Sequence, residues 1–156
     1  MTDIVTLRRI LSTHKRVAMV GLSADWWRPS FFAAKYLLEH GFKVIPVNPK
    51  YQEILGQKCY PDLKSIPTPV DIVDLFQKME RVPPFVDDAI EIGAKVVWMQ
   101  LGIINRQAAQ KALDSGLEVI MDRCMKIEYA RIFGGLNTIG VNTKIISAKR
   151  PAFVNF

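Results

Sequence analysis

Apolar and polar residues follow one repeating block along this chain. In each block an amphipathic stretch ends at a glycine, and a short apolar run rich in β-branched residues follows; the glycines are Gly41, Gly93 and Gly116. A glycine just past a helix adopts the left-handed conformation that closes the last turn. A short run that is apolar throughout is typical of a strand covered on both faces of a parallel sheet. The three blocks therefore predict helix–strand units.

The remaining elements follow from helical spacing and from capping residues. Helices are expected to begin near Asp3, Pro29, Pro83 and Asn105. Strands are expected at 16–20, 43–47, 71–76, 95–99 and 118–121. Strands that alternate with helices of this length predict a doubly wound α/β fold, with a mostly parallel five-stranded sheet and right-handed crossovers.

Two segments fit this pattern less directly. Pro46 lies in the second strand, which we expect to be internal in the sheet, so the proline should sit near the strand end because it donates no ladder hydrogen bond. Residues 134–156 form a short β-prone C-terminal tail that could pair as a hairpin on the domain or on the second subunit of a homodimer. No low-complexity linker precedes the tail, so we expect a single domain over 1–156 with its core at 15–133.

Composition narrows the class of protein. The 156 residues are 49% hydrophobic and 23% charged, which is the balance of a globular domain. No apolar run reaches the roughly 20 residues that span a bilayer, and no signal segment stands at the N-terminus. We therefore expect no membrane partner and a cytoplasmic location. Cys59 and Cys124 are too few for a disulfide framework, and no cluster has metal-ligand spacing, so we expect no metal.

The charge balance points to an anionic ligand. Lys and Arg number 21 against 15 Asp and Glu, a net charge of +6. Such an excess favours nucleic acid, acidic lipid or a phosphorylated small molecule. The basic residues occur in isolated pairs without interleaved aromatic residues, which disfavours nucleic acid.

In an open parallel sheet, ligands bind beyond the carboxyl ends of the strands. The segments expected there are 21–23, 48–50, 76–78, 100–102 and 122–124. Gly21 permits a tight turn, the following helix start offers amides to a phosphate, and Arg28 and Ser30 could add donors. The alternative is an ordinary strand-to-helix loop.

The first loop lacks the glycines of a dinucleotide fingerprint, because Ser23 and Trp26 occupy their positions. The second strand also ends without the acid that holds a ribose diol. Lys50 stands there instead, which suits a phosphate on the adenosine ribose and disfavours NAD. The longer glycine loop of triphosphate-binding proteins is absent from the sequence.

Five strings carry a resemblance to a known family: VAMVGLSADWWRPSFFAAKYLLEHGFKVIPVNPKY, ILGQKCYPDLKSIP, VDIVDLF, VVWMQLGIIN and VIMDRCMKIEYARI. Together they resemble the stand-alone CoA-binding proteins, which are similar to the nucleotide-binding domain of the succinyl-CoA synthetase α subunit. The resemblance covers about 17–150 and implies a Rossmann-like domain that binds coenzyme A or an acyl-CoA.

The resemblance also implies a role for each loop at the sheet edge. The pyrophosphate would meet Gly21, Ser23 and Arg28, with Leu22 and Ser30 in the same loop. The adenosine 3′-phosphate region maps onto Val47, Asn48, Pro49 and Lys50. Phe76 would flank the adenine, and Gln100 and Gly102 would face the pantetheine arm.

The expected function is therefore binding of coenzyme A without catalytic residues. The ligase carries a phosphorylated histidine in a further domain, and neither His14 nor His40 lies at a strand end. Cys124 is either an inert packing residue or a thiol that exchanges with that of CoA. Two alternatives stay open: an NADP- or CoA-thiol-dependent redox enzyme using Lys50 and Cys124, and a regulatory subunit of an acyl-CoA ligase-like partner.

Overall fold

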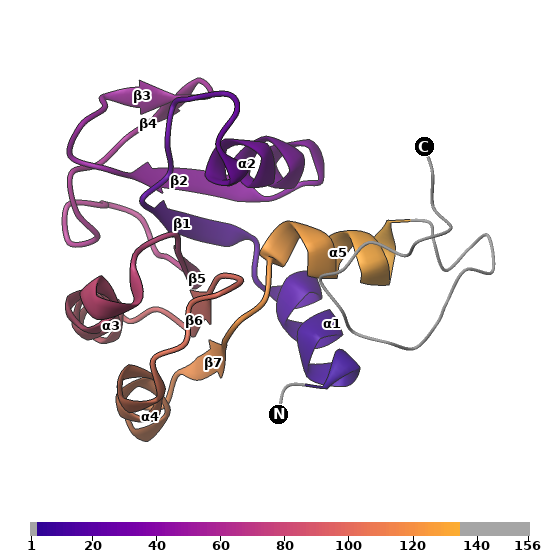
Figure 1. Ribbon diagram of the computed structural model, residues 1–156, viewed down its shortest axis with the longest axis vertical. Helices are drawn as coiled ribbons and strands as arrows, with labels where there is room; N and C mark the ends of the chain where they lie inside the picture. Colours follow the sequence, from indigo (N-terminus) through magenta and orange to yellow (C-terminus); the bar gives the residue numbers. More distant parts are fainter. Residues whose placement is uncertain (1–2, 135–156) are drawn as a thin grey trace.

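Five parallel strands form the centre of the computed structural model, which describes residues 3–134. The strands are β1 (Arg16–Val20), β2 (Lys43–Val47), β5 (Ile72–Leu75), β6 (Val96–Met99) and β7 (Glu118–Ile120). Their order in the sheet is β2-β1-β5-β6-β7, with every neighbouring pair parallel. All five expected strands are confirmed to within one residue at each end, as is the doubly wound, Rossmann-like α/β class (Figure 1).

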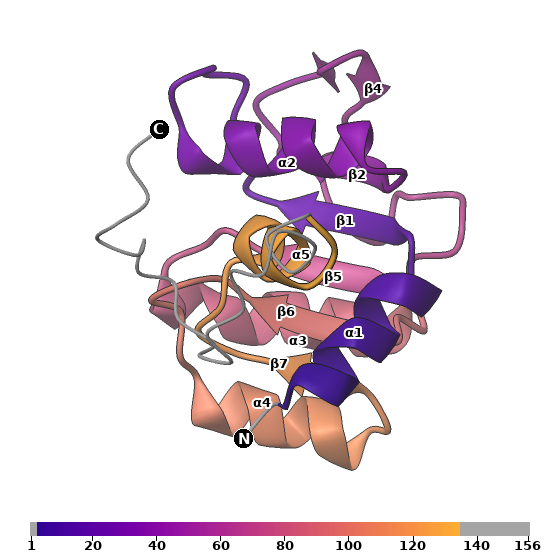
Figure 2. The same ribbon diagram turned by 90° about the vertical axis from the view of Figure 1, so that its right-hand side faces the viewer.

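Helices cover both faces of the sheet (Figure 2). They are α1 (Ile4–Thr13), α2 (Pro29–Glu39), the 3-10 turn η1 (Met79–Arg81), α3 (Val82–Glu91), α4 (Arg106–Asp114) and α5 (Met125–Phe133). Buried side chains of α1, α2 and α5 share one apolar core with the sheet, and those of α3 and α4 share the other. The sheet therefore separates two cores, and its carboxyl edge lies open between the two layers.

The expected helix starts have local causes in the structure. The Asp3 carboxylate accepts a hydrogen bond from the Thr6 amide at 2.7 Å, and the Asn105 side chain accepts one from the Ala108 amide at 3.0 Å. Pro29 occupies the first turn of α2, where a missing amide costs nothing. The two capping contacts fix where α1 and α4 begin, and the proline favours the start of α2.

The second strand lies at the edge of the sheet, so the expectation of an internal strand was wrong. The carbonyl of Pro46 accepts a hydrogen bond from the Tyr60 amide at 2.9 Å on the side away from β1. The amide of Lys43 and the carbonyl of Val47 form their hydrogen bonds on the side of β1. Because neighbouring residues of a strand point their backbone groups to opposite sides, the nitrogen of Pro46 faces away from β1, where no ladder donor is needed. An edge strand thus accommodates Pro46 without loss of a hydrogen bond.

The sequence did not predict the hairpin β3–β4, the turn η1 or the helix α5. A short antiparallel hairpin, β3 (Glu53–Ile54) and β4 (Gln57–Lys58), turns at Leu55 and Gly56, which both have positive φ. The helix α5 has Glu128 within its buried stripe, and this charged residue obscures the helical spacing. The β-prone tail expected at 134–156 lies outside the described residues, apart from Gly134.

Candidate functional site

A cleft of about 1090 Å³ opens at the carboxyl edge of the sheet. The loops that follow β1, β2, β5 and β6 line it, together with the first turns of α2 and α5. In the order β2-β1-β5-β6-β7 the chain changes direction between β1 and β5, and this switch point is where open α/β sheets bind ligands. The expected location of the site is therefore hollow in the structure.

The loop after β1 is pressed against the end of β5. Gly21 has φ of +86°, and a Cβ at this position would lie 2.2 Å from the carbonyl oxygen of Phe76. Only glycine fits this approach. The Ser23 amide then donates to the Oγ of Ser30 at 3.1 Å, which ties the loop to the first turn of α2. The loop and the first turn of α2 are thereby held together at the cleft, which Gly21, Ser23 and Ser30 all line.

Asn48 ties the end of β2 to the loop after β1. Its Nδ2 donates to the carbonyl of Leu22 at 3.1 Å, and its Oδ1 accepts from the amide of Lys50 at 3.0 Å. The second contact is an Asx turn that holds the backbone at Lys50. The Lys50 ammonium group is thereby carried on a fixed backbone at the cleft wall.

Positive charge predominates in the cleft. The cationic side chains that line it are Arg28, Lys50, Lys78, Arg81 and Lys126. Asp25 is the one acidic lining residue among residues 3–134, and it lies 3.8 Å from the guanidinium of Arg28. The other four cations form no ion pair within residues 3–134. Such a concentration of unpaired cations attracts a polyanion.

A buried carboxyl group lies beneath the cleft. Asp74 on β5 is fully buried, and Gln100, which lines the cleft, donates from Nε2 to its Oδ1 at 2.5 Å. Burial raises the pKa of the Asp74 carboxyl to about 7, although the hydrogen bond from Gln100 opposes the shift. Oδ2 of Asp74 has no hydrogen-bond partner among residues 3–134. Such an orphaned buried oxygen is costly and uncommon in protein cores.

Cys124 lies at the far side of the cleft from β2. It precedes the first turn of α5, is partly exposed and lines the cleft with Lys126 and Ile127. Burial raises the pKa of the Cys124 thiol, and the charge of Asp74 raises it further. The backbone amides of Ile127 and Lys126 oppose this shift. The thiol is therefore protonated at neutral pH.

The structure gathers most of the sequence-predicted site residues around this cleft. Those that line it are Gly21, Ser23, Arg28, Ser30, Asn48, Lys50, Phe76 and Gln100. Leu22 and Val47 instead point into the two cores, and Pro49 and Gly102 lie outside the lining. Whether any of these residues contacts a ligand stays a prediction.

Several lining residues were missed by the sequence reasoning. Arg81 lies in η1 and Lys126 in α5, two elements that carried no clear periodic signal. Trp27 also lines the cleft, with the Arg28 guanidinium 4.7 Å from its ring centre. Trp26 is 70% exposed and lies outside the lining.

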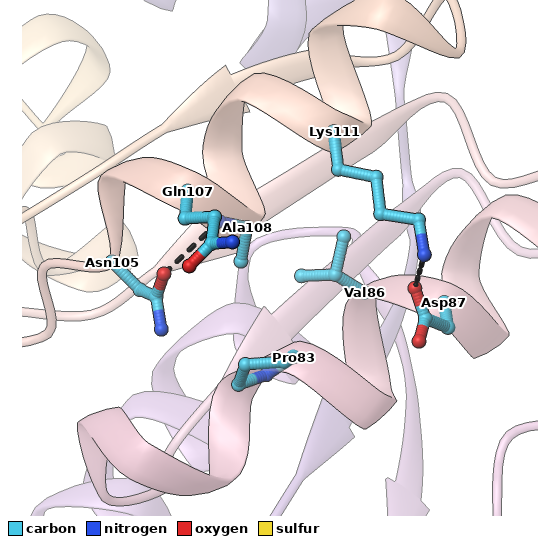
Figure 3. A pocket seen from close by; sticks show the side chains of 7 residues that line it. All are labelled: Pro83, Val86, Asp87, Asn105, Gln107, Ala108 and Lys111. Atoms are coloured by element: carbon cyan, nitrogen blue, oxygen red, sulfur yellow. Dashed lines mark hydrogen bonds and ion pairs between the residues drawn. The ribbon is translucent and has the colours of Figure 1, made fainter.

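A smaller cavity of about 230 Å³ lies between α3 and α4 (Figure 3). Its two charged lining residues, Asp87 and Lys111, form an ion pair at 2.5 Å, and Asn105 is used in capping α4. With its charges neutralised and its amide occupied, this cavity offers little to an anionic ligand.

Other kinds of site receive no support within residues 3–134. No group of three or more His, Cys, Asp or Glu side chains there could hold a metal ion. His14 and His40 are the C-terminal caps of α1 and α2, away from the cleft lining. Within the same described residues no helix has the length and apolarity needed to cross a bilayer.

Comparison with known proteins agrees with this geometry. The model of the CoA binding domain family matches residues 15–130. An uncharacterized protein of Bacillus subtilis, YneT, is 40% identical over 80% of this chain and 92% of its own. The solved structure of a hypothetical protein from Pyrococcus horikoshii superposes with a TM-score of 0.83 at 45% identity, covering 85% of this chain and 94% of that one.

A longer relative carries the same domain as part of an enzyme. The ADP-forming acetate–CoA ligase II of Archaeoglobus fulgidus is 35% identical over 56% of this chain, which is 13% of the ligase. The chain thus matches only a small part of that enzyme, and the match lies in its CoA-binding part. By these matches the chain belongs to the CoA-binding domain family.

Proposed function

We propose that this protein binds coenzyme A or an acyl-CoA in the cleft at the carboxyl edge of the sheet. The observation that carries the proposal is the group of unpaired cations in the cleft, namely Lys50, Lys78, Arg81 and Lys126. Coenzyme A carries a pyrophosphate and a ribose 3′-phosphate, so its nucleotide half needs several cationic partners. Membership in the CoA-binding domain family supports the same ligand.

The ligand runs across the strand ends in this proposal. The 3′-phosphate lies at Lys50 beyond β2, and the pyrophosphate lies against the Gly21 loop and the start of α2. The pantetheine arm then extends past the end of β5 to Gln100 and α5. Four gaps between neighbouring strands, each about 4.8 Å, give the arm and the nucleotide a path of roughly 19 Å.

Lys50 distinguishes this proposal from NAD binding. A dinucleotide site holds the ribose diol with a carboxylate after the second strand, and here the sequence is Asn48, Pro49, Lys50. The Asn48 side chain is already engaged by Leu22 and by the backbone of Lys50. A cation at this position favours a ribose phosphate, which CoA has and NAD lacks.

Titration calorimetry with CoA and dephospho-CoA tests the proposal, because the two ligands differ only in the 3′-phosphate. A charge-assisted hydrogen bond from Lys50 is worth about 1.5–3 kcal/mol, so the wild type should prefer CoA by roughly tenfold to a hundredfold. Lys50→Ala should lose most of this preference and bind dephospho-CoA as before. NADP and NAD titrated in parallel test the redox alternative.

Lys43→Ala is the matched control, because Lys43 is an exposed lysine at the amino end of β2, the strand that Lys50 follows. It should leave the CoA preference intact. Binding of NADP as tight as that of CoA, or no binding of CoA at all, would contradict the proposal.

A further inference from the structure

The two cysteines of this chain have different surroundings. Cys59 is buried, 6% exposed, and donates from Sγ to the carbonyl of Asn48 at 3.3 Å. Cys124 is partly exposed and lines the cleft. A reagent that enters the cleft therefore meets one thiol and is shielded from the other.

The charge distribution sets the direction of a bound CoA along the cleft. Arg28, Lys50, Lys78 and Arg81 follow β1, β2 and β5, and Lys126 alone belongs to the side formed by α5. The phosphates of a bound CoA should contact the larger group of cations, on the side of β1, β2 and β5. The uncharged pantetheine arm, which ends in a thiol, then extends toward the side where Gln100 and Cys124 lie.

The buried carboxyl of Asp74 is a second, independent observation at this end of the cleft. It lies directly behind the wall, because its Oδ1 is bonded to Gln100, and its charge acts on the thiol of Cys124. Its Oδ2 has no partner among residues 3–134 and is fully buried. A buried polar atom without a partner is uncommon in protein cores, and a carboxyl with a strongly perturbed pKa beside a cleft is typical of functional sites.

We propose that Cys124 is a covalent attachment site, where its sulfur forms a mixed disulfide with the thiol end of a CoA bound in the cleft. The inference rests on the proposed function, because the cleft must first bind the nucleotide half. The co-reactant is a disulfide of CoA. The Cys124 thiol loses its proton to water, its sulfur attacks one sulfur of the CoA disulfide, and a new sulfur–sulfur bond forms. The old sulfur–sulfur bond breaks, and the second CoA leaves as a thiolate that takes a proton from water.

Charged and polar groups on two elements affect the stability of the attacking Cys124 thiolate. From α5, the backbone amides of Ile127 and Lys126 and the Lys126 ammonium group stabilise it. From β5, the carboxylate of Asp74 opposes it. Asp74 becomes ionised near neutral pH, and above that pH its charge opposes formation of the Cys124 thiolate. The exchange rate should therefore rise less steeply with pH than it would for a thiol without a neighbouring carboxylate.

The experiment exposes the reduced full-length protein to CoA disulfide, with cystamine as a small disulfide that lacks the nucleotide. Intact mass and peptide mapping follow the adduct over time. We expect one CoA on Cys124 and none on Cys59, formed at least about tenfold faster than the cystamine adduct because the bound nucleotide raises the local concentration. Cys124→Ser should form no adduct, and Cys59→Ser should behave as the wild type.

Asp74→Asn provides a second, independent readout. Removing the negative charge increases the thiolate fraction, and this gain exceeds the accompanying loss of nucleophilicity. Exchange with CoA disulfide should therefore be several-fold faster than in the wild type at pH 8 and nearly equal at pH 6. An unchanged or slower rate at pH 8 would overturn the role of Asp74 beside the thiol.

The outcomes separate the inference from the proposed function. Reduced CoA that binds the wild type in calorimetry, with no adduct from CoA disulfide, overturns the attachment site and leaves CoA binding intact. Failure of reduced CoA to bind overturns the proposed function, even if Cys124 reacts. Equal rates for CoA disulfide and cystamine, or equal labelling of Cys59, would also overturn the site.

Discussion

Replacing Gly21 by alanine tests the packing that shapes the cleft. The residue has φ of +86°, and the added Cβ would lie 2.2 Å from the Phe76 carbonyl oxygen, roughly 1 Å short of ordinary contact. Because the obstructing atom is backbone at the end of β5, the two loops must separate. Overpacking of this kind costs about 1–3 kcal/mol.

A second term comes from the backbone conformation itself. A non-glycine residue in the left-handed region destabilises the folded state by about 1–2 kcal/mol. Alanine also restricts the unfolded chain more than glycine does, which offsets roughly 0.4–1 kcal/mol of that cost. Gly116→Ala isolates this term, because Gly116 has φ of +89° and nothing within 4 Å of its Cβ position. Gly21→Ala should therefore destabilise the protein by about 1–3 kcal/mol more than Gly116→Ala does.

Urea unfolding of both variants measures the difference as a shift in midpoint at unchanged slope. Calorimetry should also show weaker CoA binding in Gly21→Ala and unchanged binding in Gly116→Ala, since only the first loop lies at the cleft. Equal midpoints for the two variants would refute the close approach of the loop after β1 to β5.

Two further predictions concern groups around the cleft. The folded-state pKa of Asp74, about 7, exceeds its unfolded value, so the folded protein binds the extra proton and loses stability as pH rises. Between pH 5 and pH 8 this loss should be about 2–3 kcal/mol, and Asp74→Asn should abolish it in urea unfolding at both pH values. Asn48→Ala removes the contacts to Leu22 and Lys50, so it should cost about 1–2 kcal/mol in unfolding and weaken CoA binding more than dephospho-CoA binding.

The sequence predicted the sheet well because its signals are local. Each strand is a short apolar run, and glycines such as Gly41 and Gly116 close the helices that precede them. The order of the strands is not a local property. Pro46 was compatible with the end of an internal strand or with an edge strand. The structure shows that β2 pairs with β1 alone within the five-stranded sheet, which makes β2 an edge strand.

The candidate site was predictable only in part, for a similar reason. Strand ends such as Gly21, Lys50 and Gln100 can be placed on one sheet edge from the parallel topology alone. Leu22 adjoins Gly21, yet its side chain turns into the core with α2, and sequence adjacency could not show that. Lys126 was missed because α5 buries Glu128 between Arg123 and Arg131, which breaks the apolar stripe that identifies a helix.

The carboxyl edge of the sheet differs from the amino edge in its charges and in its hydrogen bonding. At the amino edge, the Asp71 carboxylate accepts a hydrogen bond from the Arg16 amide, and the Asp71 carbonyl accepts from the amides of Lys95 and Val96. At the carboxyl edge, Lys50, Lys78, Arg81 and Lys126 lack ion-pair partners within residues 3–134, and the carboxyl of Asp74 is buried with one oxygen orphaned. Neither feature helps the two apolar cores to form. A ligand that carries negative charge beside these cations and ends in a thiol near Asp74 and Cys124 would pair with the cations and reach the buried carboxyl, so both features favour a charged, thiol-bearing ligand at this edge.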